Sequence, residues 1–308
     1  MDKKCLFLFN MHSGKGSVRA KLVWMIDGLN KLGYELIVYS TQRAGDAERL
    51  VMEHASELNL VVCAGGDGTV SETIMGLQKS GRDIPLAFLP CGSTNDYAGS
   101  LRVPGSPLKL LELIEKESFR SIDVGRFNDK YFDYVAAFGV LTDIAYTTDQ
   151  KLKNVIGYGA YVLEVAKRLL KIPVLSITIE TDRGLKLSDG WFYGMITNSH
   201  QVGGLKKITG PDVKPDDGIF EVTLVRATRN PIEFTEVLGA IATGADSRFI
   251  ERFKASRIVL KSDEPIPWTI DGEPGGGHKE VIIENVQQAL RIAAPEDKRR
   301  RKRILKKR

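Results

Sequence analysis

The sequence predicts an α/β protein with an N-terminal three-layer α/β/α domain and a C-terminal, mostly antiparallel β-sandwich domain. The length of 308 residues suits two domains of ordinary size. Short apolar runs alternate with helical patterns until about residue 117, and strand-like runs dominate from Phe119 onward. Alternating strands and helices are typical of a parallel sheet, whereas successive strands are typical of an antiparallel one.

The N-terminal part contains four expected strands and three expected helices. Each strand is a continuous apolar run, which is typical of parallel strands buried on both faces. In chain order we expect strand Lys4–Asn10, helix Val18–Leu32, strand Tyr34–Ser40, helix Asp46–Leu58, strand Asn59–Ala64, a helix at about Val70–Leu77 and strand Pro85–Pro90. This is a nucleotide-binding type of architecture, in which ligands lie at the carboxyl ends of the strands.

The C-terminal part is rich in strands and is interrupted by two helices, expected at about Tyr158–Lys171 and Pro231–Ala242. Its strand-like runs are Ser121–Phe127, Tyr131–Phe138, Leu175–Thr181, Trp191–Thr197, Phe220–Val225, Arg257–Leu260, Trp268–Asp271, Val281–Ile283 and Ala289–Ala293. We place the two domains at residues 1–120 and 121–290. A segment near 287–297 is a candidate to complete the first domain.

The net charge of +5 comes from the end of the chain. Residues 298–308 hold nine basic and no acidic side chains, so the rest of the chain carries a net charge of −4. Such a run cannot bury a core, and we expect a disordered basic tail. It is suited to binding an anionic membrane surface. The alternative is a solubilising tail without a catalytic role, and we expect no specific nucleic-acid partner.

The remaining composition indicates a cytoplasmic protein. No window approaches 18 uninterrupted apolar residues, and the first apolar run is too short for a signal peptide. The cysteines Cys5, Cys63 and Cys91 form no CxxC pair, and buried reduced thiols are the simplest interpretation. The four histidines have no zinc-ligand spacing.

The segment Gly65-Gly66-Asp67-Gly68-Thr69 carries the strongest chemical signal. It follows a buried strand and precedes a helix. Glycines allow close approach of the backbone to a polyphosphate, and N–H groups at a helix start point at an anion. Asp67 is a candidate metal ligand and Thr69 a candidate phosphate donor. The alternative for this segment by itself is an ordinary Asp-Gly turn.

Two further strand ends carry similar side chains. Gly92–Ala98 supplies a glycine, hydroxyl groups and the pair Asn95-Asp96, for which plain helix capping is the alternative. Asn10, Ser13 and Gly14 follow the first strand but lack the Walker A spacing. They are candidates to line a nucleotide.

These segments, together with Ile270-Asp271-Gly272-Glu273, resemble the diacylglycerol kinase catalytic family, which includes bacterial lipid kinases and relatives of sphingosine kinases. The resemblance covers nearly the whole chain. The loop Gly65–Thr69 is shared with NAD kinases and relatives of phosphofructokinase. The segment Thr94–Ala98 and the turn Asp271–Glu273 are what narrow the similarity to lipid kinases.

The resemblance implies that the first domain binds ATP and that the second binds a lipid. It implies nucleotide contacts from Asn10, Ser13, Gly14, Thr41, Gly65, Gly66, Asp67, Gly68, Thr69, Val70, Ser71, Glu72, Thr94 and Asn95. It implies that Asp67 and Asp96 organise a catalytic Mg²⁺. It also implies that Asp271 and Glu273 act on the lipid hydroxyl, and we expect Glu273 to be the base with Asp271 in support.

A second magnesium site is implied by similarity of residues 210–220 to the structural metal loop of the family. Its ligands would be the Asp217 carboxylate and the carbonyl groups of Lys214 and Ile219. Crowded oxygen donors suit a hard cation. A metal-free Asp-Gly turn is the alternative.

We therefore expect an ATP-dependent kinase that phosphorylates diacylglycerol or a similar neutral lipid at the membrane surface, giving a phosphatidic-acid-type product. An NAD kinase on the same scaffold is one alternative. A lipid- or nucleotide-binding protein without catalytic activity is the other. A homodimer is left open, as is the choice between phospholipid synthesis and lipid signalling.

Overall fold

The computed structural model describes residues 3–16, 18–139, 174–202, 213–228 and 230–296. The chain divides into two compact units. Unit 1 contains the residues up to Ile122 and those from Gln288 onward, and unit 2 contains Asp123–Gln287. The predicted helix Tyr158–Lys171 and the basic tail at 298–308 lie outside the described residues.

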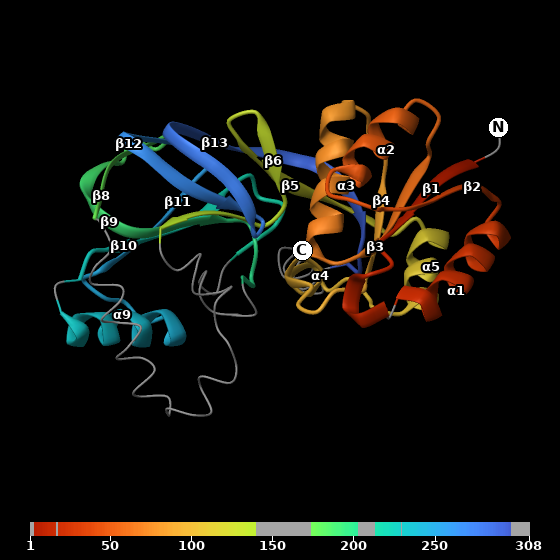
Figure 1. Cartoon of the computed structure of the whole chain (residues 1–308), viewed down its shortest axis with the longest axis horizontal. Helices are drawn as coiled ribbons and strands as arrows, with labels where there is room; N and C mark the ends of the chain where they lie inside the picture. Colours follow the sequence, from red (N-terminus) through yellow and green to blue (C-terminus); the bar gives the residue numbers. More distant parts are fainter. Residues whose placement is uncertain (1–2, 17, 140–173, 203–212, 229, 297–308) are drawn as a thin grey trace, which may run out of the picture. The chain divides into compact units, whose positions relative to one another are not determined.

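Unit 1 is built on a parallel sheet with the strand order β13-β4-β3-β1-β2. Figure 1 shows its helices on both faces of this sheet, which makes three layers. Its elements are β1 (Lys3–Phe9), η1 (Ser13–Gly16), α1 (Val18–Lys31), β2 (Tyr34–Ser40), α2 (Asp46–His54), β3 (Leu60–Gly65), α3 (Asp67–Ser80), β4 (Leu86–Pro90), α4 (Asp96–Leu101) and α5 (Pro107–Glu115), closed by the end of β13 (Glu273–Ala293).

Alternation along each strand explains the two covered faces. Phe7 and Val62 belong to one buried cluster that also contains Met25 from α1 and Leu110 from α5. Along β3, the residues directly before and after Val62 point to the opposite face of the sheet. Both faces are covered, so every position of β3 is buried. On that opposite face α2 and α3 pack closely, because a Cβ atom at Gly76 would lie 2.8 Å from the backbone of Glu48.

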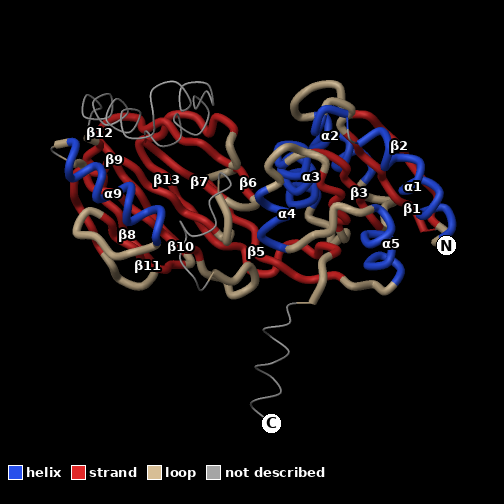
Figure 2. Tube along the Cα trace, turned by 90° about the horizontal axis from the view of Figure 1, so that it is seen from below, coloured by secondary structure: helices blue, strands red, loops and turns tan. Residues whose placement is uncertain are grey.

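Unit 2 is mostly antiparallel, with the order β11-β10-β9-β7-β12-β13, while β8 pairs with β12 and β9. Figure 2 shows how strands dominate this unit, with α9 as its labelled helix. Its elements are β5 (Phe119–Phe127), β6 (Lys130–Phe132), β7 (Val135–Gly139), β8 (Leu175–Thr181), β9 (Lys186–Thr197), β10 (Phe220–Arg226), α9 (Pro231–Thr243), β11 (Ile250–Ala255) and β12 (Arg257–Ile270), with most of β13. Both β5 and β13 run from one unit into the other.

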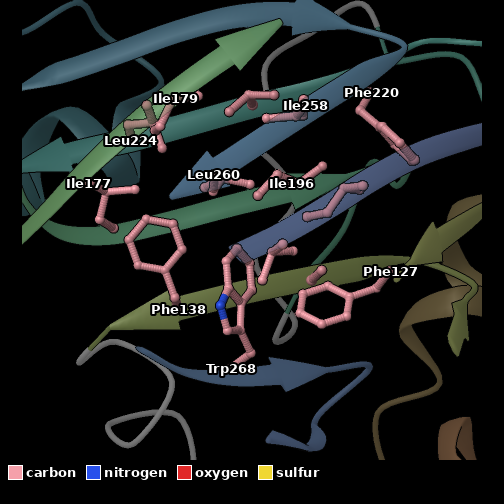
Figure 3. Close-up of a cluster of buried hydrophobic side chains, with 14 of the residues drawn as sticks. Phe127, Phe138, Ile177, Ile179, Ile196, Phe220, Leu224, Ile258, Leu260 and Trp268 are labelled. Carbon is pink, nitrogen blue, oxygen red and sulfur yellow. The ribbon is translucent and has the colours of Figure 1, made fainter. Parts of the chain in front are cut away.

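The core of unit 2 is aromatic at its centre. Trp268 packs edge-to-face against Phe127 at 5.0 Å and against Phe138 at 4.9 Å between ring centroids. Figure 3 shows these rings beside the isoleucine and leucine side chains of neighbouring strands. Such edge-to-face pairs add to the free energy gained from burial alone. This core fixes the end of β12, immediately before Asp271.

The predicted fold class is confirmed, and several element boundaries are wrong. The predicted strands Arg257–Leu260 and Trp268–Asp271 are parts of the single strand β12, which ends at Ile270 and bulges between Lys261 and Ile266. The prolines there are tolerated at an irregular position of a strand. The run Tyr131–Phe138 is instead two strands, because the chain turns at Asp133 and Tyr134. The sequence patterns did not predict α5 or β11.

Candidate active site

The two glycine-containing loops of unit 1 meet at the carboxyl ends of β3 and β4. Gly65 and Pro90 are register partners, and the N–H of Cys91 donates to the carbonyl oxygen of Gly65 at 2.7 Å. A Cβ atom at Gly92 would lie 2.7 Å from the Cα of Gly66. The loops therefore touch through their backbones, and a side chain at position 92 would force them apart.

Helix α3 begins at Asp67, directly after the glycines. Gly66 precedes it in an extended conformation and offers no side-chain cap to the first N–H groups. Those groups are ready to bind an anion, and the helix dipole favours negative charge at the same point. Gly68 is exposed, whereas the side chain of Thr69 packs against Gly65. A Cβ atom built on Gly65 would lie 2.6 Å from the Thr69 side chain. The predicted phosphate loop thus has an open, donor-rich surface.

Two carboxylates stand beside these loops. The N–H of Tyr97 donates to Oδ1 of Asp67 at 3.3 Å, which places Asp67 against the first turn of α4. Burial raises the pKa of the Asp67 carboxyl, and the nearby charge of Asp96 raises it further, while backbone N–H groups oppose the shift. Asp96 is itself buried. A pair of like charges held together in this way is suited to a divalent cation.

Two hydrogen bonds between Gly92 and Asn95 hold the loop before α4. The N–H of Gly92 donates to Oδ1 of Asn95 at 2.8 Å, and Nδ2 of Asn95 donates back to the Gly92 carbonyl at 2.7 Å. Asn95 adopts a left-handed conformation, with φ of 53°. The side chain of Asn95 therefore shapes the loop, in which Ser93 and Thr94 are exposed.

The first two strands add four predicted contact residues at the same edge of the sheet. Asn10 accepts a bond from the N–H of His12 through Oδ1 at 2.9 Å and so shapes the turn that contains Ser13. Gly14 follows at a φ of 55°, which glycine adopts without strain. Thr41 is buried and its N–H donates to the carbonyl of Phe9 at 2.9 Å. These residues gather at the carboxyl ends of β1 and β2.

Three residues of α3 complete the predicted nucleotide set. Val70 is buried and Ser71 is half-buried. The Glu72 carboxylate accepts bonds from the N–H groups of Gly45 at 2.9 Å and Ala47 at 3.3 Å. Glu72 therefore stabilises the start of α2, a structural role that the sequence did not indicate.

In unit 2, Asp271 and Gly272 form the two-residue turn between β12 and β13. Their φ values of 48° and 86° and the pairing of Ile270 with Glu273 are those of a type I′ hairpin. The buried Asp271 carboxylate accepts bonds from three consecutive backbone N–H groups, those of Asp133, Tyr134 and Val135, at 2.8–3.1 Å. It is thereby fixed against the segment that joins β6 to β7.

Glu273 is exposed at the start of β13, and a bulge follows it. Trp268 pairs with Gly276 and Thr269 with Pro274, so Gly275 is the extra residue. The ring Nε2 of His278 lies 3.1 Å from the Gly275 carbonyl and donates to it, and Nζ of Lys130 lies 3.4 Å from the same oxygen. The bulge that sets the direction of the chain after Glu273 is thus held by two side chains.

The predicted second metal loop is described from Val213 onward, and residues 210–212 lie outside the described part. Oδ1 of Asp217 is buried without a hydrogen-bond partner among the described residues, as are Oδ1 of Asn198 and Oε2 of Glu221. Burial raises the pKa of Glu221 to about 7, with a further contribution from the Asp217 charge, and Lys254 opposes it. Buried oxygens without donors fit a hard cation.

Other contacts around this loop include residues that the sequence did not single out. Lys214 is exposed, and its Nζ lies 3.7 Å from the other carboxylate oxygen of Asp217. Asp123 accepts the N–H of Gly218 at 2.6 Å, and its own N–H donates to the Pro215 carbonyl at 2.7 Å. Ile219 is half-buried between this loop and β10. Asp123 lies too far along the chain for its role to be visible in local spacing.

Within the described residues, neither a metal-binding group of side chains nor a membrane-spanning helix is found. No three His, Cys, Asp or Glu side chains of the described part form a group that could hold a metal ion by themselves. Of the helices in the same part, none has the length and apolar character needed to cross a bilayer. A cation at Asp67 or Asp217 would therefore need ligands such as backbone carbonyls, substrate phosphates or water.

Comparisons with known proteins agree with this arrangement. The chain matches the diacylglycerol kinase catalytic domain over residues 4–127 and the YegS C-terminal NAD kinase beta sandwich-like domain over residues 136–294. Diacylglycerol kinases of Staphylococcus aureus (strain MRSA252) and Staphylococcus epidermidis (strain ATCC 12228 / FDA PCI 1200) are each 30% identical over 302 residues, which is 96% of this chain and 94% of theirs. The crystal structure of a putative diacylglycerol kinase from Bacillus anthracis str. Sterne is 26% identical, with a TM-score of 0.77, and the match covers 95% of this chain and 97% of that one.

The fold, the two meeting loops and the match to a kinase catalytic domain identify a kinase, a phosphotransferase with an alcohol acceptor. The chain belongs to the diacylglycerol kinase family, because family models match both of its units and relatives match it over almost its whole length.

Proposed function

We propose that this kinase transfers the γ-phosphate of ATP to the hydroxyl group of diacylglycerol or a similar neutral lipid and forms a phosphatidic-acid-type product. The observation that carries the proposal is the pairing of Asp67 and Asp96 beside two touching glycine loops at the carboxyl ends of β3 and β4. The names of the similar proteins support the choice of lipid.

The nucleotide half of the proposed mechanism uses the backbone of unit 1. N–H groups at the start of α3 and the exposed residues Ser93 and Thr94 bind the phosphates, because a helix start offers backbone donors and hydroxyl groups offer side-chain donors. Asp67 and Asp96 are the residues that would hold Mg²⁺. When bound, this ion neutralises charge that develops on the phosphate oxygens.

The acceptor half requires a group that removes the hydroxyl proton. The lipid oxygen forms a bond to the γ-phosphorus, ADP leaves, and the hydroxyl proton passes to a carboxylate. Glu273 is our choice for this base, because it is exposed, whereas the Asp271 carboxylate already accepts three backbone bonds. Asp271 positions the turn from which Glu273 extends.

The loop around Asp217 is proposed to hold a structural Mg²⁺ through its carboxylate and through carbonyl groups at Lys214 and Ile219. The buried Oδ1 of Asp217, which has no hydrogen-bond partner within the described part of the chain, supports this role. The loop leads directly into β10, so a cation there would stabilise unit 2 without taking part in the reaction.

The decisive experiment measures transfer of radiolabelled γ-phosphate to a panel of lipids in mixed micelles, with NAD as a further acceptor. We expect Mg²⁺-dependent labelling of diacylglycerol or a related neutral lipid. Labelling of NAD without labelling of any lipid would overturn the proposal. A preparation carrying Glu273→Gln is the matched negative control, since it keeps the nucleotide half unchanged.

We further propose that the protein is cytoplasmic and binds membranes reversibly through residues 298–308. Each basic side chain near an anionic leaflet contributes about 1 kcal/mol, so nine are ample for binding at low salt. Sedimentation with anionic vesicles compares the full chain with a variant in which the nine basic residues are replaced by glutamine. Equal binding of the two proteins at low salt would contradict a role for the tail.

A further inference from the structure

Lys21, the fourth residue of α1, reaches the end of strand β4. Its Nζ donates to the carbonyl oxygen of Pro90 at 3.2 Å, and the side chain is half-buried. The Lys21 ammonium also lies close to the thiol of Cys91, whose pKa is raised by burial and lowered by that charge. A cation is thus held against the first residue of the loop that contains Gly92.

Most of the lysines whose contacts are described have a carboxylate partner, and Lys21 does not. Within the described residues Lys21 makes no ion pair with an acidic side chain, and its hydrogen-bond acceptor is a neutral carbonyl. Eight other lysines lie within 4.0 Å of a carboxylate: Lys4, Lys31, Lys79, Lys116, Lys186, Lys214, Lys254 and Lys261. A half-buried ammonium without a counter-charge is costly unless an anion joins it.

The position of Lys21 identifies that anion. Pro90 is the register partner of Gly65, and the N–H of Cys91 donates to the Gly65 carbonyl. The ammonium therefore lies at the same edge of the sheet as both glycine loops, where the proposed polyphosphate binds. A lysine side chain can also swing from a carbonyl to a phosphate, because its stem is flexible and its charge is compact.

We propose that Lys21 binds the polyphosphate of the nucleotide and supplies positive charge that neither glycine loop provides. The inference rests on the proposed function, since it names a further residue of that nucleotide site. The competing role is structural: Lys21 would only tie α1 to the end of β4. The two roles differ in how the contribution of Lys21 depends on the number of phosphates in the ligand.

The experiment measures equilibrium binding of ATP, ADP and AMP, each with Mg²⁺, by calorimetry. It compares the full-length protein with Lys21→Met, Lys21→Arg and Lys31→Met. Lys31 is the matched control, because it lies on the same helix and its ammonium pairs with Asp27 at 2.7 Å. We expect Lys21→Met to weaken ATP binding about tenfold or more, the scale of a lost charged hydrogen bond. AMP binding should change less than about twofold, and Lys21→Arg should retain most of the ATP affinity.

Two results would overturn the inference. One is ATP affinity of Lys21→Met equal to that of Lys31→Met. The other is an equal loss for ATP and AMP, which indicates a structural tie, and a lowered melting temperature would accompany it. Failure of the unaltered protein to bind any adenine nucleotide would instead overturn the proposed function, so the two failures are distinguishable.

Discussion

Gly66 and Gly92 are in backbone contact: a Cβ atom built on Gly92 would lie 2.7 Å from the Cα of Gly66. The two residues are on loops that follow neighbouring parallel strands. Their contact brings the start of α3 and the start of α4 to one point, and with them Asp67 and Asp96.

Replacing Gly92 by alanine should therefore separate the two loops. We expect the free energy of unfolding to fall by about 1–3 kcal/mol, as for other overpacked sites. Nucleotide affinity should fall more than tenfold, because the phosphate donors no longer converge. Chemical denaturation and calorimetry measure the two effects. Gly105→Ala is the matched control, since a Cβ there meets nothing within 4 Å, and an equal response of both variants would contradict the prediction.

Asp67→Asn should stabilise the metal-free protein while removing activity. Burial and Asp96 raise the pKa of Asp67, so the folded state keeps this proton to higher pH than the unfolded state does. Stability then falls as the pH rises above the unfolded value of 3.8, and the ionised carboxylate is destabilising at neutral pH. The neutral amide removes this cost. We expect a higher melting temperature in EDTA and a turnover number reduced about a hundredfold or more.

That prediction fails if Asp67→Asn lowers the melting temperature in EDTA. Addition of Mg²⁺ with ADP provides the control, because it should raise the melting temperature of the unaltered protein and leave that of the variant nearly unchanged.

Asp271→Asn and Glu273→Gln should have different effects on stability. The Asp271 carboxylate accepts three buried backbone bonds, and an amide has a single acceptor oxygen. We expect Asp271→Asn to lower the free energy of unfolding by about 3 kcal/mol. Glu273 is exposed, so Glu273→Gln should fold normally and lose turnover by about 10²–10⁴-fold, the usual contribution of a general base.

Circular dichroism during urea denaturation and steady-state kinetics test this pair. Normal turnover of Glu273→Gln would remove Glu273 as the base. Unchanged stability of Asp271→Asn would remove the structural role of the Asp271 carboxylate.

Glu221 should give unit 2 a pH-dependent stability in the absence of metal. Burial raises its pKa from 4.5 to about 7, so the unfolded chain loses this proton first. The free energy of unfolding should therefore decrease between about pH 4.5 and pH 7, by at most about 1.4 kcal/mol per pH unit for one proton. Glu221→Gln should flatten this part of the profile in EDTA. An unchanged slope would show that Glu221 is already ionised in the folded protein.

The local patterns of the sequence were sufficient for much of the fold. Both Tyr34–Ser40 and Leu175–Thr181 are strands with the predicted bounds, because each is an uninterrupted run of strand-forming residues. The strand β12 was predicted as two pieces, since the bulge after Lys261 and its prolines interrupt the apolar pattern. Periodicity also could not show that β13 continues from unit 2 into unit 1.

The candidate site, like the fold, was predicted from the sequence only in part. The sequence by itself determined which residues follow the strands, because glycines, carboxylates and hydroxyls at strand ends are visible as local patterns around Asp67 and Asp96. Only the tertiary structure decided that Glu72 stabilises α2, that Asp271 is held by the backbone of residues 133–135, and that Lys21 reaches Pro90. Those contacts join positions 27 to 138 residues apart, and their distances depend on how helices and turns pack rather than on spacing along the chain.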